Sequence, residues 1–524
     1  MNHRLAITLL SLALASVAGT AEPKPNILWI SCEDMSPDLG CYGDRYATTP
    51  QLDQLASQGC RYTRAFVVFP VCAPSRSAII TGVHPGTLGT MHMRTGDKGY
   101  EAVPPPDVKC FPEYLRAAGY YCVNHTKTDY QFAAPFTAWD APKGDWRNAD
   151  RKPGQPFFCV INLAISHESR DWDIKQVSHN PAQAPLPPFY PDTPKVRRGL
   201  ARYYDQVEKM DGQAGDILRR LKEDGLADST IVFFWSDHGR GLPRYKRWPY
   251  DTGLRVPLLI RWPGHIQPGS VIEELVCFTD LAPTLLSLAG IQRPAYMQGR
   301  VLLGKDKGPE PQYVFGGRNR MDVASDDFIR TCRDRRYRYI HNFTPSTPYA
   351  QVIPYMEQSP ILQEWRRLNA EGALTGPQKL FFAPTKPAEE LYETEADPFE
   401  VHNLAGLPEQ QQRLQALRAA LDKWMKDTGE LGGLPENELI QRFWPDHKQP
   451  ATAAPVMAIE GDGKLKMSCA TPGASIGYRV GTDARWQVYT GPFPVPAGVT
   501  VHAKAIRIGF SVSGETSWPT PQTR

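Results

Sequence analysis

Cys72-Ala73-Pro74-Ser75-Arg76 runs directly into Ser77-Ala78-Ile79-Ile80-Thr81-Gly82, and this stretch is the most informative part of the 524 residues. The pattern predicts one or two helical turns that a glycine closes, with a proline near the helix start. Unpaired backbone N–H groups and the helix dipole favour an anion at that end. The Arg76 guanidinium has donors that match the oxygens of sulfate or phosphate. We therefore expect the cysteine beside an anion site, although a buried cysteine before an ordinary helix would show the same pattern.

Strands alternate with helices on both sides of this stretch. Apolar residues spaced by three and four predict a long helix from Val196 to Leu221. Apolar runs predict strands at Pro25 to Ile30, Phe157 to Ala164, Thr230 to Trp235 and Val256 to Trp262. The alternation is typical of an α/β core. Open sheets of this class bind ligands beyond the carboxyl ends of their strands, and the acidic pair Glu33-Asp34 follows the first strand.

The character of the sequence changes after residue 310. We expect residues 22–310 to form the α/β domain and residues 311–447 a smaller α+β subdomain, with a helix around Glu409 to Met425. Residues 448–455 are rich in Pro and Ala, which is typical of a linker. Short strands between Gly/Pro turns predict a small all-β sandwich over residues 456–524. This module resembles the fibronectin-like C-terminal modules of secreted glycosidases. We expect a structural role for it, with carbohydrate binding as the alternative.

The N-terminus predicts export. Residues 1–21 have the pattern of a signal peptide, with Arg4 before the short apolar run Leu5 to Val17 and small residues at Ala18 and Ala21. An uncleaved anchor is the alternative, and no second apolar run approaches a spanning length. The 59 Lys and Arg balance the 56 Asp and Glu, so nothing indicates nucleic acid or a membrane surface as a partner. The ten cysteines contain no C-x-x-C pair, which argues against a zinc ribbon.

Further motifs follow in order between residues 25 and 425. They are Glu33-Asp34, Gly119-Tyr120 with Lys127-Thr128-Asp129, Ser166-His167, Ser236-Asp237-His238-Gly239, and Lys246 shortly before Tyr250-Asp251. Together with Cys-x-Pro-Ser-Arg they resemble the type I sulfatases, whose core is an alkaline-phosphatase-like α/β fold with a small α+β subdomain. The run Asp-His-Gly-x-Gly-x-Pro-Arg-x-Lys, from Asp237 to Lys246, is closer to bacterial glycan sulfatases and the heparan N-sulfatase group than to arylsulfatases.

The resemblance implies a modified residue and a bound metal ion. Cys72 would be oxidised to formylglycine, whose hydrate attacks sulfate esters. A divalent metal, usually calcium, would be bound by Glu33, Asp34, Asp237 and His238 together with the modified Cys72. Carboxylate oxygens suit calcium and an imidazole suits it less well, so magnesium, manganese and zinc stay open. Glu33 is a departure, because the family usually has aspartate there.

The resemblance also implies catalytic roles. Arg76 belongs to the nucleophile motif, and Lys127 would bind the sulfate and the formylglycine oxygen. His167 would protonate the leaving group, since imidazole changes charge near neutral pH, with Lys246 as the alternative donor and sulfate contact. Many relatives have histidine at the position of Asp129, so either Asp129 acts as the base or that task moves elsewhere.

Four further residues are candidates for contact with a sugar or its carboxylate. They are His92, Arg94, Arg318 and Arg320, each of which could equally be part of a salt bridge. The implied substrate is a sulfated polysaccharide or its oligosaccharides. The implied partner during biogenesis is a formylglycine-generating or anaerobic sulfatase-maturating enzyme. A phosphoesterase or phosphonate monoester hydrolase of the same superfamily, and a non-catalytic glycan-binding relative, are the alternatives.

Overall fold

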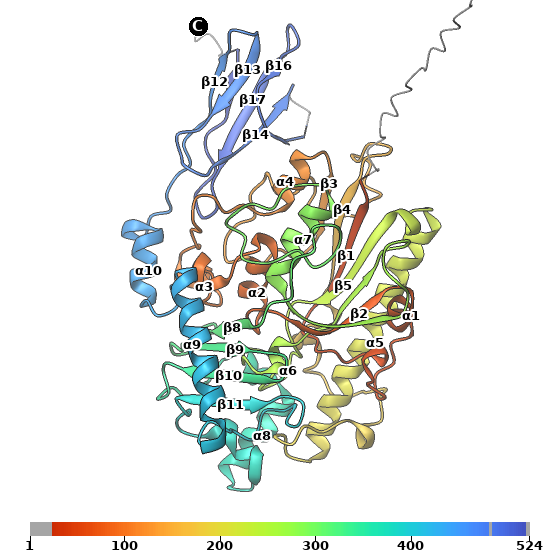
Figure 1. The fold of residues 1–524 in the computed structure, drawn as a ribbon, viewed down its shortest axis with the longest axis vertical. Helices are drawn as coiled ribbons and strands as arrows, with labels where there is room; N and C mark the ends of the chain where they lie inside the picture. The colour runs from red at the N-terminus through yellow and green to blue at the C-terminus, as the bar shows by residue number, and fades with distance from the viewer. Residues whose placement is uncertain (1–23, 482–484, 520–524) are drawn as a thin grey trace, which may run out of the picture.

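A computed structural model of the protein describes residues 24–481 and 485–519 (Figure 1). The expected signal peptide, residues 1–21, lies outside these ranges. Within them, no helix combines the length and the apolar character that a membrane span requires. All ten cysteines fall inside the described ranges as free thiols, and Cys159 and Cys277 are buried in the packed interior.

Seven strands form the central sheet, and β1 (Asn26–Cys32) is the third of them. β1 pairs in parallel with β4 (Phe157–Leu163) on one side and with β5 (Thr230–Ser236) on the other. The order is β3-β4-β1-β5-β6-β2-β7, where the other strands are β3 (Tyr121–His125), β6 (Leu258–Arg261), β2 (Cys60–Phe66) and β7 (Ser270–Cys277). β6 runs antiparallel to both of its neighbours. The predicted α/β core is confirmed, and the carboxyl ends of β4, β1 and β5 meet at one edge.

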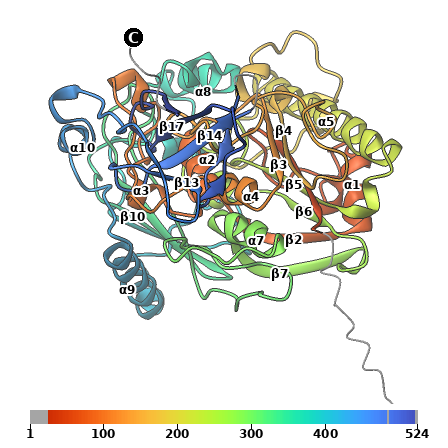
Figure 2. The ribbon, with the colours of Figure 1, turned by 90° about the horizontal axis from the view of Figure 1, so that it is seen from above.

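Helices cover both faces of this sheet, because successive side chains of β1 point to opposite sides. Leu28 and Ile30 pack with α1 (Pro50–Gln58) and α5 (Pro194–Glu223), the long helix predicted from its apolar spacing. Ile27 and Trp29 pack on the other side with α4 (Pro112–Ala117) and α7 (Leu281–Leu288). Figure 2 shows α1 and α5 on one side of the strands and α7 on the other. α2 (Cys72–Thr81) and the short α3 (Pro85–Leu88) follow β2 along the chain.

A second, antiparallel sheet forms the α+β part of the fold, in the order β11-β10-β9-β8. Its strands are β8 (Val314–Arg318), β9 (Ile329–Arg333), β10 (Tyr337–Asn342) and β11 (Glu389–Glu393). α9 (Gln411–Thr428) covers it with Leu414, Leu417 and Leu421, close to the bounds that the sequence predicted (Figure 1). α8 (Pro360–Ala370) and α10 (Glu436–Phe443) complete this part.

Buried ion pairs join the two sheets at α6 (Asp251–Leu254). Nη2 of Arg333 lies 2.9 Å from Oδ2 of Asp251, and Nε of Arg338 lies 2.8 Å from Oδ1. Arg338 also lies 3.2 Å from Oε1 of Glu400, whose second oxygen accepts the Asp251 backbone N–H. We call Asp251, Arg333, Arg338 and Glu400 the arginine cluster. It fixes the second sheet against the loops that follow β5.

Two small sheets form the C-terminal module, as predicted. The first sheet contains β12 (Val456–Ile459), β13 (Lys464–Ser468) and β16 (Phe493–Pro494). The second contains β15 (Gln487–Val488), β14 (Ser475–Val480), β17 (Val501–Ile506) and β18 (Thr516–Trp518). The module contacts the larger part of the protein where Lys109 donates to Ser475 over 2.9 Å and where the Phe136 and Trp486 rings lie 5.5 Å apart. These contacts adjoin α4 and the start of β3, so the module sits away from the carboxyl edge of the central sheet (Figure 1).

Candidate active site

The carboxyl edge of the central sheet brings the predicted site residues together. Glu33 and Asp34 follow β1, Asp237 and His238 follow β5, and His167 follows β4 after one 3-10 turn. The Asp34 backbone N–H donates to Oδ1 of Asp237 over 3.2 Å, although the two residues are 203 positions apart. Parallel pairing of β1 with both neighbours therefore places three distant segments around one point.

Cys72 is the first residue of α2, and only 1% of its surface is exposed. Its Sγ lies 3.2 Å from Nε2 of His238 and 4.0 Å from Oδ1 of Asp34. Gly82 closes the helix with a φ of +72°, the left-handed conformation that glycine adopts easily. The predicted helix start therefore does place the cysteine beside the strand ends.

Two lysines make the position of Cys72 electropositive. Nζ of Lys127 lies 2.7 Å from Oε2 of Glu33, and Nζ of Lys246 lies 2.7 Å from Oδ2 of Asp34. Burial raises the pKa of the Cys72 thiol, but Lys127 and Lys246 outweigh burial and lower it to about 6. An anionic group at this position is therefore favoured.

Arg76 acts on the site through Asp237. Its Nε donates to Oδ2 of Asp237 over 2.9 Å, and its Nη1 donates to Oδ1 of Asn162 over 2.8 Å. The side chain is 4% exposed, and Nη2 is buried without a partner in the described residues. The sequence suggested a direct match to substrate oxygens. In the structure two of the three guanidinium nitrogens instead hold a candidate metal ligand and the end of β4.

The carboxylates, the imidazoles and Cys72 form two overlapping groups that suit a cation. Within each group the ligand atoms lie within 4.8 Å of one another, and the groups are Glu33, Asp34, Cys72 and His167, and Asp34, Cys72, Asp237 and His238. Burial lowers the pKa of His238, but Asp237 and Asp34 outweigh burial and raise it to about 10. The surrounding charge therefore attracts a positive group. Carboxylate oxygens with one or two imidazole nitrogens fit a divalent cation.

Asp34 is the carboxylate that both groups share, together with Cys72. Its φ is +54°, a strained value for a non-glycine residue, and its side chain is fully buried. The Glu168 backbone N–H donates to Oδ2 over 2.8 Å, and Nε2 of His238 lies 3.0 Å from Oδ1. Burial raises the pKa of Asp34, but Lys246 and His238 hold it well below its usual range. Asp34 is therefore a permanently charged carboxylate.

Glu168 and Arg247 complete the surroundings of Lys246, and sequence reasoning gave neither a role. Nζ of Lys246 lies 2.8 Å from Oε1 of Glu168, and both terminal nitrogens of Arg247 bond the same carboxylate over 2.8 and 2.9 Å. Burial raises the pKa of Glu168, but Arg247 and Lys246 outweigh burial and lower it to about 2. The only sequence signal was their position beside His167 and Lys246.

His167 has one nitrogen held and the other directed at the site. The Ser169 backbone N–H donates to Nδ1, while Nε2 lies 3.8 Å from Oε2 of Glu33. An Nδ1 that accepts this N–H requires the tautomer with the proton on Nε2, and the Ser169 hydroxyl, 2.9 Å from Nδ1, can then donate to the same nitrogen. Burial and Lys246 lower the pKa of His167, but Asp34 and the Cys72 sulfur outweigh them and raise it.

Asp129 lies between two cations at the mouth of the site. Nη1 of Arg94 is 2.5 Å from its Oδ1, and Nζ of Lys127 is 3.8 Å from its Oδ2. The Arg94 side chain remains 39% exposed. The structure therefore brings Asp129 and Arg94 to the site, which leaves the predicted sugar contact of Arg94 open to test.

The other three candidate sugar contacts are buried inside the protein. Arg318 is 0% exposed, with its Nε 3.1 Å from Asp327, and Arg320 is 2% exposed, with its Nε 2.6 Å from Glu436. His92 is 3% exposed, and burial lowers its pKa to about 4. The expectation that these three side chains face a sugar is not met, because their polar groups are enclosed by protein.

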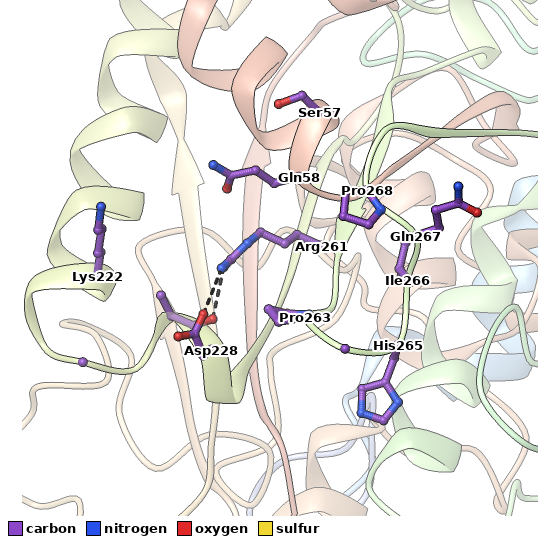
Figure 3. Close-up of a pocket in the computed structure, with 13 residues that line it drawn as sticks. Ser57, Gln58, Lys222, Asp228, Arg261, Pro263, His265, Ile266, Gln267 and Pro268 are labelled. Atoms are coloured by element: carbon purple, nitrogen blue, oxygen red, sulfur yellow. Dashed lines mark hydrogen bonds and ion pairs between the residues drawn. The ribbon is translucent and has the colours of Figure 1, made fainter.

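A hollow of about 800 Å³ lies at the opposite edge of the central sheet (Figure 3). Its lining includes Lys222 and Asp228 before β5, Gln58 at the end of α1, and Arg261 at the end of β6. Arg261 pairs with Asp228 at 3.5 Å. The groups that converge on Cys72 are absent from the residues that line this hollow, so the carboxyl edge is the better candidate for chemistry.

The family model described as Sulfatase matches residues 25–137 and 143–291. This chain belongs to the sulfatase family. The matched ranges contain every residue of the two cation-binding groups as well as Arg76, Lys127 and Lys246. The protein is therefore a sulfuric ester hydrolase, and the family inferred from the motifs is confirmed.

Curated relatives of the sulfatase include proteins with glycan substrates. It is 41% identical to an ulvan-active sulfatase of Formosa agariphila, over 94% of this chain and 90% of the relative. It is 28% identical to the N-sulphoglucosamine sulphohydrolase of Homo sapiens, over 83% of this chain and 98% of the relative. The likeness to both groups agrees with the run from Asp237 to Lys246.

Solved structures share the fold of the sulfatase. A 2-O GAG sulfatase matches with a TM-score of 0.59 at 21% identity, over 78% of this chain and 93% of that chain. A phosphonate monoester hydrolase from Silicibacter pomeroyi matches with a TM-score of 0.58 at 16% identity, over 85% and 99%. The two scores are nearly equal, so the fold alone does not distinguish sulfate from phosphonate chemistry.

Proposed function

We propose that this sulfatase hydrolyses sulfate esters of a sulfated polysaccharide or its oligosaccharides, with a formylglycine made from Cys72 and a bound divalent cation. The observation that supports this most directly is the placement of Cys72, at a helix start and within 4.8 Å of the ligand atoms of Asp34, Asp237 and His238. The 41% identity to an ulvan-active sulfatase supports a polysaccharide substrate.

The proposal includes export and a biogenesis partner. Residues 1–21 would direct the chain to the periplasm or outside the cell, where a polysaccharide substrate would be accessible to it. A formylglycine-generating or anaerobic sulfatase-maturating enzyme would oxidise Cys72. Exchange of the thiol sulfur and two hydrogens for one oxygen gives the aldehyde.

The two groups would supply the nucleophile and part of the charge stabilisation. Position 72 would hold the formylglycine hydrate, which supplies an oxygen nucleophile for sulfur. Glu33, Asp34, Asp237 and His238 would hold a cation, which supplies positive charge beside the sulfate. Calcium is the first candidate, because three of these four ligands are carboxylates. Cys72 and the carboxylates are neighbours, which supports placing the formylglycine and the cation next to each other.

The lysines and His167 would serve the sulfate and the leaving group. Lys127 and Lys246 flank Cys72, so their ammonium groups can stabilise the charge that develops on sulfate oxygens. The Nε2 proton of His167 would pass to the leaving oxygen, because Nδ1 is already held by Ser169. Lys246 is the alternative proton donor.

Asp129 would act as the base that returns the site to its starting state. Its Oδ2 is buried without a hydrogen bond in the described residues, and Lys127 lies 3.8 Å away. A carboxylate with a free lone pair can accept a proton from the group at position 72. Arg94 holds the other oxygen and so fixes the side chain.

Mass spectrometry and product analysis test the proposal together. The tryptic peptide that contains Cys72, from protein made in its own host, should show the exchange of H₂S for O. The same protein should release sulfate from sulfated polysaccharides, lose activity when dialysed against a chelator, and regain it with calcium. Unmodified Cys72 in mature protein would rule out the formylglycine route. Faster turnover of a phosphate or phosphonate monoester than of any sulfate would rule out the substrate assignment.

Hydrolysis of N-sulfate is a second candidate activity. The 28% identity to an N-sulphoglucosamine sulphohydrolase extends over 98% of that relative. A site that protonates a leaving oxygen through His167 can also protonate a leaving nitrogen. Assays on matched O-sulfated and N-sulfated glucosamine would separate the two, since the preferred substrate should have the higher kcat/KM.

A further inference from the structure

An exposed aromatic side chain stands directly beside His167. The ring centroid of Tyr355 lies 6.1 Å from that of His167, with an interplanar angle of 60°. Tyr355 is 42% exposed, which is high for a large side chain so close to a buried catalytic cluster. Its segment precedes α8 and belongs to the part of the chain after the family match, so two separate regions meet at this point.

Neighbouring residues hold the Tyr355 ring in place. The Trp172 ring meets it edge to face, with centroids 4.9 Å apart and planes at 67°. Ile353 is fully buried and Met356 is 2% exposed, so the backbone on both sides of Tyr355 is anchored in the core. Trp172 also lies only five positions after His167. The exposed ring is therefore fixed relative to the catalytic imidazole by two independent attachments.

The reaction geometry determines what must lie next to this ring. His167 reaches the leaving oxygen by a hydrogen bond of about 3 Å if it is the acid. That oxygen is bonded directly to a carbon of the sugar ring that bears the sulfate. A pyranose attached there would lie beside the imidazole, and the centre of the Tyr355 ring is 6.1 Å from that of His167.

The two flanks of the site differ in character. Arg94, Asp129 and Lys127 form a charged flank, linked by contacts of 2.5 and 3.8 Å. Tyr355 and Trp172 form an aromatic flank beyond His167. Sugar rings have the matching asymmetry, because one face presents C–H groups while hydroxyl and carboxylate groups point outward. Small-molecule sites commonly combine aromatic surface with a few polar groups in this way.

We propose that Tyr355, held edge-on by Trp172, is the stacking wall of the subsite that binds the pyranose ring carrying the scissile sulfate. This subsite rests on the proposed function, because it takes His167 as the group that faces the leaving oxygen. Tyr355 contributes its aromatic face to the C–H face of the sugar, and the phenol hydroxyl is not required. Trp172 is a positioning residue that limits rotation of the Tyr355 ring.

Steady-state kinetics on two kinds of substrate test the subsite. Tyr355→Ala should lower kcat/KM on a sulfated oligosaccharide by about 10-fold to 100-fold, through KM more than kcat, because it removes the aromatic surface on which the sugar packs. Tyr355→Phe should keep wild-type kcat/KM, because the ring is retained. Trp172→Ala should have a smaller effect in the same direction. Hydrolysis of a small alkyl sulfate, which has no ring to stack, should change less than 3-fold in every variant.

A matched control separates stacking from stability. Leu380 is also 42% exposed, and Leu380→Ala removes a comparable apolar side chain in the same subdomain. It should leave both substrates unaffected, and the Tm of all four variants should stay near that of wild type. Equal loss on the alkyl sulfate and the oligosaccharide would mean that Tyr355 only supports the fold, and the subsite would be wrong.

The outcomes also distinguish the subsite from the proposed function. Wild-type protein with verified formylglycine that releases no sulfate from any oligosaccharide would overturn both. If the Tyr355→Ala variant hydrolyses oligosaccharides as well as wild type does, the subsite alone is wrong and the sulfatase assignment stands. Loss of activity in Tyr355→Phe as well as in Tyr355→Ala would show that the hydroxyl matters, which also contradicts stacking.

Discussion

Two groups of buried charge in this protein use similar residues for different ends. In the arginine cluster, Arg333 and Arg338 both meet Asp251, so the shortest contacts join opposite charges. At the active site, Asp34 and Asp237 also have cationic partners, Lys246 and Arg76. In addition, ligand atoms of these two carboxylates converge with those of Cys72 and His238, all within 4.8 Å of one another. Both groups are almost fully enclosed by protein.

The difference shows that burial of charge does not by itself indicate function. Opposite charges that satisfy each other stabilise an interface between elements. Like charges that the fold forces together repel each other, and they lower their energy only when a cation or a protonated group joins them. The raised pKa of His238, which Asp237 and Asp34 cause against the effect of burial, is the sign of that second arrangement.

The largest expected effect is on activity alone. Cys72→Ala should reduce sulfate release by about 10⁴-fold or more, because loss of a nucleophile removes the covalent route. The Tm should fall by only a few degrees, since one small buried atom is removed. Sulfate release and thermal unfolding of the same preparation check both parts. A variant that keeps more than a tenth of wild-type activity would show that the nucleophile lies elsewhere.

The second prediction is the converse: the free energy of unfolding should fall while the activity per folded molecule is retained. Asp251→Ala leaves Arg333 and Arg338 buried without their shared carboxylate, so we expect a cost of about 3–5 kcal/mol in the free energy of unfolding. Denaturant unfolding measures it. Activity per folded molecule should stay within about 3-fold of wild type at low temperature. A large loss of kcat in folded protein would mean that the arginine cluster is coupled to catalysis.

The third prediction uses pH to separate Glu400 from its neighbours. Burial and Asp251 raise the pKa of Glu400 from 4.5 to about 8, so the folded state binds a proton that the unfolded state releases. The stabilisation that Glu400 adds to the free energy of unfolding is fully present below pH 4.5, and it is lost as the pH rises through about 8. Glu400→Gln should therefore flatten the decline of stability between pH 5 and 8, by about 3.5 kcal/mol. An unchanged slope of Tm against pH would contradict the raised pKa.

The smallest effect should come from an exposed ion pair. Arg367 and Glu371 lie one helical turn apart in and just after α8, 2.7 Å from each other, and both side chains are 52% exposed. Glu371→Ala should change the free energy of unfolding by less than about 0.5 kcal/mol, since solvent already screens the pair. Unfolding in high salt provides the control. A cost comparable to that of Asp251→Ala would remove the distinction between buried and exposed pairs.

Much of the site could be predicted because its chemistry follows strands. Glu33, Asp34, Asp237 and His167 come shortly after apolar runs, and parallel pairing brings such positions together. The helix of 30 residues was evident from its apolar spacing. The sandwich was evident from turns and alternation.

The partners of these residues could not be predicted, because they depend on distance in space. Arg318 and Arg320 were candidates for sugar contact or for salt bridges, and each is enclosed with a carboxylate that lies 9 or 116 positions away. Glu168 looked like an ordinary loop residue, and only packing shows that it receives both Lys246 and Arg247. Tyr355 has no local pattern at all, since its neighbour His167 belongs to a different part of the chain.

The burial of Cys72 would set a time limit on the proposed oxidation of its thiol. Every residue of α2 is buried in the folded protein, and the loop after β5 covers Sγ through His238. The proposed oxidising enzyme could therefore reach the thiol only before β5 joins β1. That strand is synthesised after Cys72, and at 5–20 residues per second the delay is roughly 10–30 s. The fraction of active molecules would then depend on the rate of thiol oxidation relative to the rate of folding around Cys72. A substitution that speeds early folding would lower activity without changing a residue of the site.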